Sequence, residues 1–325
     1  MIVVTGGAGF IGSATIWRLN QLGYEKIIVV DELRDQEKWK NLNGLKFVDI
    51  YHKKEFYEQI VQERLPLSID AIIHLGACSA TTEKNADYLV QNNYRYSLEL
   101  VRYCLPRRAR FIYASSAATY GGGEFGYDDN EEELEKLRPL NMYGYSKHMF
   151  DLWLKTNHLS SKVAGIKYFN VYGPNEYHKG DMRSVVHKAF EQIRDTGKVT
   201  LFKSHRDDYK DGEQKRDFIY VKDAVDMTLY FLENRDKGGL FNVGTGNSRT
   251  WNDLVAAIFK SLDKPVNIEY IDMPENLRGK YQYFTEANLD KIRNVGYEKP
   301  VGSIEDGVED YVKNYLLKEK YIGYW

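Results

Sequence analysis

The chain has 325 residues, of which 43% are hydrophobic, and its formal net charge is −2. This length suits one large domain or two coupled domains, and the balanced, scattered charge disfavours a nucleic-acid or anionic-membrane surface. No apolar stretch approaches the ~18 residues of a membrane span, and no signal peptide precedes the first strand. The two cysteines lack metal-ligand spacing, so we expect a reduced, cytoplasmic protein with no metal and no membrane or nucleic-acid partner.

Short β-branched runs alternate with amphipathic stretches over the first half of the chain. Strands are predicted at 2–5, 26–30, 46–48, 71–75, 110–114 and 163–168, and helices at about 10–22, 53–64, 85–104 and 142–158. Continuous apolar strands interleaved with helices are typical of βαβ units around a buried parallel sheet. The fold class predicted is therefore α/β, a Rossmann-type doubly wound parallel sheet.

The pattern changes after Gly173-Pro174, where segments become shorter and more polar. We predict a dinucleotide-binding domain over residues 1–170 and a smaller α/β substrate-binding domain mainly over 171–325. The strand-like run 217–221 and the helix after Asp223 are expected to return to the first domain, so its return segment covers about 214–245.

A glycine-rich turn follows the first strand and opens the first helix. Gly6, Gly9 and Gly12 stand at the spacing of a dinucleotide-binding fingerprint. The first glycine permits a tight turn, the second lets a diphosphate approach the backbone, and the third allows close helix–sheet packing. The helix N-terminus then supplies free N–H groups for the anion.

An acid, Asp31, ends the second strand about 20 residues after the glycines, where it is placed to hold the adenosine ribose hydroxyls and favours NAD. Arg34 and Lys38 lie just beyond it and could instead hold the 2′-phosphate of NADP, which Glu32 would oppose. From these residues NAD and NADP remain open. Asp49, placed after the predicted third strand, either accepts a hydrogen bond from the adenine amine or caps the next helix.

Tyr143 and Lys147 form the only Tyr-x-x-x-Lys sequence in the chain. Residues i and i+4 of a helix share a face, so both side chains can enter one site. A nearby ammonium and a positive nicotinamide ring are expected to lower the pKa of the phenol and make it an acid/base group. Ser116 follows the fifth strand, at the sheet edge that faces the ligand, and could donate to the substrate oxygen.

These residues resemble an extended short-chain dehydrogenase/reductase, and further stretches resemble the ADP-L-glycero-D-manno-heptose 6-epimerase family over nearly the whole chain. The stretches that carry the closer resemblance are 5–13, 74–79, 81–83, 115–121, 143–147, 169–174, 178–180, 216–221 and 241–246. Gly76-Ala77-Cys78-Ser79 and His178-Lys179-Gly180 are the more specific parts.

The resemblance implies a sugar-nucleotide epimerase that interconverts the C6 epimers of an ADP-linked heptose of the lipopolysaccharide core. Bound NADP would take hydride from C6, leave a ketone there, and return the hydride to the opposite face. Because the intermediate must rotate, its oxygen points in two directions, and one acid/base group cannot serve both steps. By resemblance, Tyr143 serves one orientation and Lys179 the other. The resemblance also implies a homo-oligomer, a pentamer.

Position by position, the resemblance assigns two groups of contacts. Its cofactor contacts fall on Phe10, Ile11, Asp31, Glu32, Lys38, Lys53, Leu75, Gly76, Ala77, Cys78, Ser79, Asn92, Lys147 and Val171. Its substrate contacts fall on Asn170, Asp181, Lys188, Phe202, Lys203, Ser204, His205, Arg216 and Tyr281. The chain departs from the family pattern at Glu32, Leu75, Asp181 and Lys188, and in the stretches 205–214 and 318–325.

Three other functions are compatible with a nucleotide-binding fold. A 4,6-dehydratase would carry an Asp-Glu pair after the catalytic hydroxyl, where this chain has Ala117-Ala118. A UDP-hexose 4-epimerase needs only the Tyr–Lys pair, which would leave Lys179 an ordinary surface lysine. A non-catalytic NADP-binding regulator commonly lacks the Tyr or the Lys, and both are present here.

Overall fold

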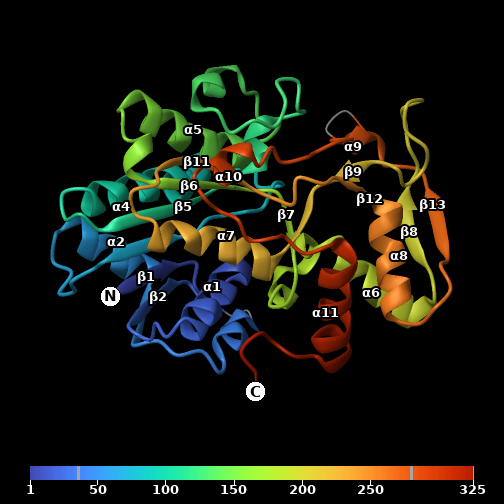
Figure 1. The fold of residues 1–325 in the computed structure, drawn as a ribbon, viewed down its shortest axis with the longest axis horizontal. Helices are drawn as coiled ribbons and strands as arrows, with labels where there is room; N and C mark the ends of the chain where they lie inside the picture. The colour runs from blue at the N-terminus through green and yellow to red at the C-terminus, as the bar shows by residue number, and fades with distance from the viewer. Residues whose placement is uncertain (35–36, 279–280, 325) are drawn as a thin grey trace.

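A seven-stranded parallel sheet forms the centre of the protein in a computed structural model, which describes residues 1–34, 37–278 and 281–324. The strand order is β11-β6-β5-β4-β1-β2-β3 (Figure 1). The strands are β1 (Ile2–Thr5), β2 (Ile27–Asp31), β3 (Asp49–His52), β4 (Ala71–His74), β5 (Arg110–Ser116), β6 (Ala164–Tyr168) and β11 (Gly239–Val243). This order and the flanking helices confirm the predicted Rossmann-type α/β fold.

Helices cover both faces of this sheet. Successive side chains of a strand point to opposite faces, and in these strands both sets are apolar, so each face is buried under helices. Val4 and Ile73 pack in one apolar cluster with the helices α1 and α7, while Val3 and Ile72 pack in a second cluster with α2, α4 and α5. Figure 1 shows α1 and α7 on one side of the strands and α4 and α5 on the other. The helices are α1 (Phe10–Gln21), α2 (Lys53–Val61), α4 (Tyr96–Cys104), α5 (Met142–Thr156) and α7 (Val221–Glu233).

The helix predicted over 85–104 contains a wider π turn in its middle. It is divided into α3 (Ala86–Leu89), the π-helical η2 (Val90–Arg95) and α4. A π turn inserts one residue into the helical ladder, which hydrophobic periodicity does not reveal. The π turn contains Asn92 and Asn93, and Asn92 lines the cavity described below.

The predicted third strand was wrong by three residues. The strand-forming residues are Asp49–His52, and Val48 is exposed rather than buried in a strand. An edge strand paired only to β2 is fixed by backbone hydrogen bonds, so its apolar residues are a poor guide to its position. Asp49 therefore begins the strand instead of following it, and His52, not Asp49, caps α2.

The second half of the chain forms smaller pieces beside the sheet. α6 (Val185–Thr196) and α8 (Trp251–Ser261) lie with the parallel pair β8 (Val199–Phe202) and β13 (Ile268–Ile271) at the right of Figure 1. β11 returns to the main sheet beside β6. The division into two domains stays a prediction. The other elements are β7 (Asn170–Tyr172), β9 (Lys215–Arg216), β10 (Phe218–Tyr220), β12 (Arg249–Thr250), α9 (Glu275–Arg278), α10 (Asp290–Asn294), α11 (Ile304–Asn314), η1 (Glu37–Leu42), η3 (Ala117–Tyr120), η4 (Glu131–Lys136), η5 (Ser160–Lys162), η6 (Tyr177–Met182) and η7 (Leu316–Lys318).

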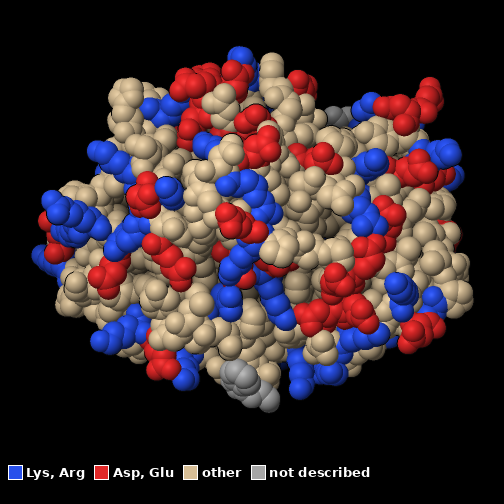
Figure 2. All heavy atoms as spheres, in the orientation of Figure 1, with Lys and Arg blue, Asp and Glu red and all other residues tan. Residues whose placement is uncertain are grey.

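The surface carries both signs of charge. Figure 2 shows basic and acidic side chains interspersed over the face that it presents. Among the described residues, no helix is both long enough and apolar enough to cross a bilayer.

Candidate active site

The glycine turn between β1 and α1 is closed by contacts that exclude side chains. Gly6 has a φ of +67°, and a Cβ at Gly12 would lie 2.1 Å from the Gly6 carbonyl oxygen. The Gly9 N–H donates to that same oxygen at 2.9 Å. A Cβ at Gly6 would meet Gly76 at 2.7 Å, so the loop after β4 also approaches the turn closely. The cradle that results fits a diphosphate at the N-terminus of α1.

A cavity of about 740 Å³ opens beside this turn, at the carboxyl ends of β1, β2, β4 and β5. Most of the residues that the sequence singled out line it. They are Gly6, Gly9, Phe10, Ile11, Gly12, Asp31, Glu32, Lys38, Lys53, Leu75, Gly76, Ala77, Cys78, Ser79, Asn92, Ser116, Tyr143, Lys147, Asn170, Val171 and Lys179. Its size and position suit a dinucleotide together with part of a second ligand.

Charged side chains gather where β2 ends at this cavity. Asp31 accepts hydrogen bonds from the Ala8 N–H at 2.8 Å and from the Lys38 ammonium at 2.6 Å. Glu32 pairs with Lys53 at 2.8 Å and with Arg34 at 2.9 Å, and the hydrogen bond from Lys53 lowers the pKa of Glu32 to about 2. Three cations therefore face two carboxylates that are already engaged within the protein.

The helix α5 approaches η3, the short helix that follows β5, through a glycine. A Cβ at Gly144 would lie 2.7 Å from the Ala118 carbonyl oxygen, so only glycine lets the two backbones come this close. The Asn141 side chain caps the helix by accepting from the Gly144 N–H at 2.9 Å. This packing brings Tyr143 into the cavity beside Ser116.

In the structure the pKa of Tyr143 is affected by Ser116 and not by Lys147. Burial raises the pKa of Tyr143, and only a hydrogen bond with Ser116 acts to lower it. The Lys147 ammonium instead donates to the Ala114 carbonyl oxygen at 2.8 Å. Burial lowers the pKa of Lys147 to about 8, against the opposing effect of Asp151. Without the cofactor, Lys147 is therefore not among the groups that lower the pKa of Tyr143, because its ammonium is held against β5, and its effect in the cofactor-bound site stays a prediction.

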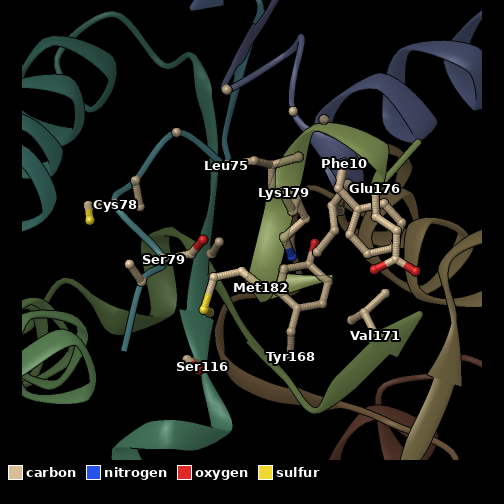
Figure 3. A pocket seen from close by; sticks show the side chains of 18 of the residues that line it. Phe10, Leu75, Cys78, Ser79, Ser116, Tyr168, Val171, Glu176, Lys179 and Met182 are labelled. Carbon is tan, nitrogen blue, oxygen red and sulfur yellow. The ribbon is translucent and has the colours of Figure 1, made fainter. Parts of the chain in front are cut away.

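Lys179, on η6, also lines the cavity. Its ammonium nitrogen lies 5.2 Å from the centre of the Phe10 ring, and Figure 3 shows the side chain directed toward Tyr168 and Met182. Burial lowers the pKa of Lys179, while the nearby Glu176 carboxylate raises it. A lysine in this setting is better able to give and take a proton near neutral pH than an exposed one.

The π turn in the helix after β4 holds the loop 76–79. The Asn93 side chain accepts from the Cys78 N–H at 2.9 Å and donates to the Cys78 carbonyl oxygen at 3.0 Å. Asn93 also donates to the Ser146 hydroxyl at 3.0 Å, which ties the same loop to α5. Asn93 was not singled out from the sequence, because its role depends on the inserted residue.

Nine of the singled-out residues do not line this cavity. They are Asp49, Asp181, Lys188, Phe202, Lys203, Ser204, His205, Arg216 and Tyr281. Lys188 donates to the Asp181 carbonyl oxygen at 3.3 Å, so these two lie together. The stretch 202–205 is joined to the 281–283 region through the Tyr283 hydroxyl, which accepts from the His205 N–H at 3.0 Å.

Arg216 adjoins the cavity through a tryptophan that the sequence analysis missed. Its guanidinium lies 5.7 Å from the Trp251 ring and 5.2 Å from the Tyr281 ring, and Trp251 itself lines the cavity. The Trp251 indole N–H donates to the Tyr281 hydroxyl at 2.8 Å. The sequence feature that could have drawn attention to Trp251 is its place directly after Thr250, which caps α8.

The family model of the NAD dependent epimerase/dehydratase family matches residues 2–244. Two relatives named ADP-L-glycero-D-manno-heptose-6-epimerase match almost end to end. The one from Nitratidesulfovibrio vulgaris (strain DP4) is 55% identical over 97% of this chain and 98% of its own. The one from Fusobacterium nucleatum is 49% identical over 98% of this chain and 99% of its own.

Solved structures of two activities share the fold. The Helicobacter pylori ADP-L-glycero-D-manno-heptose-6-epimerase is 29% identical with a TM-score of 0.81, covering 96% of this chain and 95% of its own. The Thermotoga maritima UDP-glucose 4-epimerase with UDP-glucose is 27% identical with a TM-score of 0.78, covering 98% of this chain and 99% of its own. The fold is thus common to both activities. The higher identity to the two heptose epimerases from Nitratidesulfovibrio vulgaris and Fusobacterium nucleatum is what favours the heptose activity for this chain.

Proposed function

The chain belongs to the NAD dependent epimerase/dehydratase family and, within it, to the ADP-L-glycero-D-manno-heptose-6-epimerases, and from this premise we propose how its residues act. It is a nicotinamide-dependent sugar-nucleotide epimerase. It converts ADP-D-glycero-D-manno-heptose to ADP-L-glycero-D-manno-heptose by transient oxidation and re-reduction at C6.

One observation carries the proposed mechanism: two proton-transfer groups from different elements of the fold line a single cavity. Tyr143 comes from α5 and Lys179 from η6, and both line the space beside the glycine turn. A reaction that must move protons at two oxygen positions needs two such groups. A 4-epimerase that rotates the whole sugar needs only the first.

In this mechanism the bound nicotinamide supplies the hydride acceptor and donor. Tyr143 holds or releases the proton of the C6 oxygen in one orientation of the sugar, with Ser116 donating to the same oxygen. After rotation about the exocyclic bond, Lys179 serves the oxygen in its second position. Lys147 fixes the cofactor ribose. These roles are supported by the positions of the four side chains in the cavity.

We propose NADP as the cofactor in preference to NAD. Arg34, Lys38 and Lys53 all line the cavity where β2 ends, and a 2′-phosphate would give these cations a doubly charged partner. Asp31 is engaged by the Ala8 N–H and Lys38, which leaves it less available for ribose hydroxyls. Glu32 opposes the phosphate, and NADP binding requires Lys53 and Arg34 to turn from this carboxylate toward the ligand.

We propose that the ADP diphosphate of the substrate meets Arg216, whose planar guanidinium matches phosphate oxygens. The Trp251 and Tyr281 rings flank this guanidinium. Asn170 and Val171 on β7 also line the cavity, and we propose that the heptose lies against them.

The test is incubation of the purified protein with ADP-D-glycero-D-manno-heptose, followed by NMR of the configuration at C6. We expect the L-glycero epimer to accumulate without added oxidant or reductant, because hydride is returned to the substrate. UDP-glucose and UDP-galactose, tested in parallel, should remain unchanged. Interconversion of the UDP-hexoses with no change in the heptose would overturn the proposal.

A further inference from the structure

The segment of residues 315–324 packs against the loop that carries Lys179, and we propose that this segment positions Lys179 for proton transfer. The inference rests on the role given to Lys179 in the proposed function. Lys179 itself is the group that meets the substrate oxygen, and the 315–324 segment acts through it.

Asn175 is the centre of this packing. Its side-chain oxygen accepts from the Ile322 N–H at 2.8 Å, and its amide group donates to the Ser13 hydroxyl on α1 at 2.9 Å. Both Asn175 and Ile322 have no exposed surface. Asn175 adopts a φ of +78°, a backbone conformation that asparagine tolerates better than most residues. One side chain thus joins the 315–324 segment to the helix that begins at the glycine turn.

The next two residues are held from the same direction. The Glu176 carboxylate accepts from the Tyr311 hydroxyl at 3.1 Å. The Tyr177 ring lies 4.9 Å from the Tyr321 ring, and its hydroxyl donates to the Lys320 carbonyl oxygen at 3.3 Å. The 315–324 segment therefore contacts Asn175 and Tyr177, while the residue between them is held by Tyr311 on α11, which directly precedes the segment.

A second asparagine connects this loop to the glycine turn. The Asn41 amide nitrogen lies 2.9 Å from the Ala8 carbonyl oxygen, 3.1 Å from the Asn175 carbonyl oxygen and 3.2 Å from His178 Nδ1. The 315–324 segment also packs closely against the chain that follows Asn41, since a Cβ at Gly44 would meet the Gly323 carbonyl oxygen at 2.3 Å. The loop before Lys179 is held between the diphosphate cradle and the 315–324 segment.

This arrangement matters because a lysine side chain has a long, flexible stem. Its nitrogen is placed well only if the backbone beneath it is fixed, and a displacement of about 1 Å at a reacting group can lower the rate by about 100-fold. Lys179 is followed by Gly180, which has a φ of +53° and no neighbour that would restrain a side chain. The 315–324 segment therefore reaches Lys179 through the residues before it, while Ser184 holds Glu176 from the other end of the loop.

The experiment compares a chain ending at Glu319 and an Ile322→Ala variant with an Ile292→Ala control. Ile292 is equally buried and belongs to the same apolar cluster, but it lies on α10. Single-turnover reduction of bound NADP is followed by absorbance after mixing with each heptose epimer. A Lys179→Met variant identifies the epimer whose oxidation depends on Lys179.

We expect the shortened chain and Ile322→Ala to slow oxidation of that same epimer by about 10- to 100-fold, while the other epimer reacts at the rate of the Ile292→Ala control. Hydrogen exchange of the amides at 175–180 should also be faster than in the control. Equal slowing with both epimers, or rates that match the control, would overturn the inference while leaving the proposed function intact. If Lys179→Met slows neither epimer, the two-base mechanism itself fails.

Discussion

The Lys147 ammonium nitrogen lies 2.8 Å from the carbonyl oxygen of Ala114, so the helix α5 is anchored by a buried charge to the strand β5. This contact places Lys147 at the edge of the sheet where the nicotinamide ribose would lie. Because this position is buried, it disfavours the charged form of the Lys147 side chain.

The rate should depend on the protonation of Lys147. Burial lowers the pKa of this lysine to about 8, so the ammonium is present below that pH and lost above it. We expect kcat/KM to fall about tenfold per pH unit above pH 8, as for one essential proton. A Lys147→Arg variant, whose guanidinium stays charged, should be slower but should lack this alkaline limb. The check is a pH–rate profile of both proteins.

Removing one hydroxyl at residue 143 should stop catalysis without disturbing the fold. Tyr143→Phe is expected to lower kcat by about 10²- to 10⁴-fold, the usual contribution of a positioned acid/base group, while NADP still binds. Tyr145→Phe is the matched control, because Tyr145 is on the same helix and 48% exposed. If the two variants turned over equally fast, the phenol of Tyr143 would have no part in proton transfer.

Gly144 should tolerate no side chain, although it sits in a helix. Alanine would ordinarily stabilise a helix interior by about 1 kcal/mol relative to glycine. At this position, however, its Cβ would lie 2.7 Å from the Ala118 carbonyl oxygen. We expect Gly144→Ala to lower both the free energy of unfolding and kcat. Thermal unfolding shows directly whether the variant is less stable than the unsubstituted protein. A more stable, fully active variant would contradict the close packing of α5 against η3.

Local sequence sufficed to predict the glycine turn and the Tyr143–Lys147 pair, because each is a short pattern attached to one strand and one helix. It did not predict that Lys147 bonds Ala114 rather than assisting Tyr143, since that depends on how deeply α5 packs. It also placed the third strand three residues early, because the edge strand Asp49–His52 carries no buried apolar pattern.

The residues missed altogether act across long separations in the chain. Asn175 and Ile322 are 147 residues apart, and Trp251 meets Tyr281 across 30 residues. No periodicity or motif encodes such contacts. Conversely, Arg216 was singled out by resemblance, and it lies beside Trp251, which lines the cavity, without being part of that lining itself.

Cofactor preference should respond to the charge of Glu32. This carboxylate pairs with Lys53 and Arg34, and a Glu32→Gln variant frees both cations for a 2′-phosphate. We expect the ratio of NADP to NAD affinity to rise by about tenfold, close to the 1.4 kcal/mol expected of one charge-assisted contact. Glu37→Gln, at an exposed pair with Lys40, is the control. Calorimetric titration with both cofactors gives the ratio, and a fall in it would refute the NADP assignment.

The most direct measurement for the two-base account is the rate of C6 inversion by Lys179→Met, followed by NMR with ADP-D-glycero-D-manno-heptose. A Lys198→Met variant serves as control, because Lys198 is about half exposed and paired with Glu269 on the surface. We expect Lys179→Met to bind NADP yet to lose inversion by at least about 100-fold, while Lys198→Met inverts the sugar normally. Inversion by Lys179→Met at the rate of the control would contradict the account.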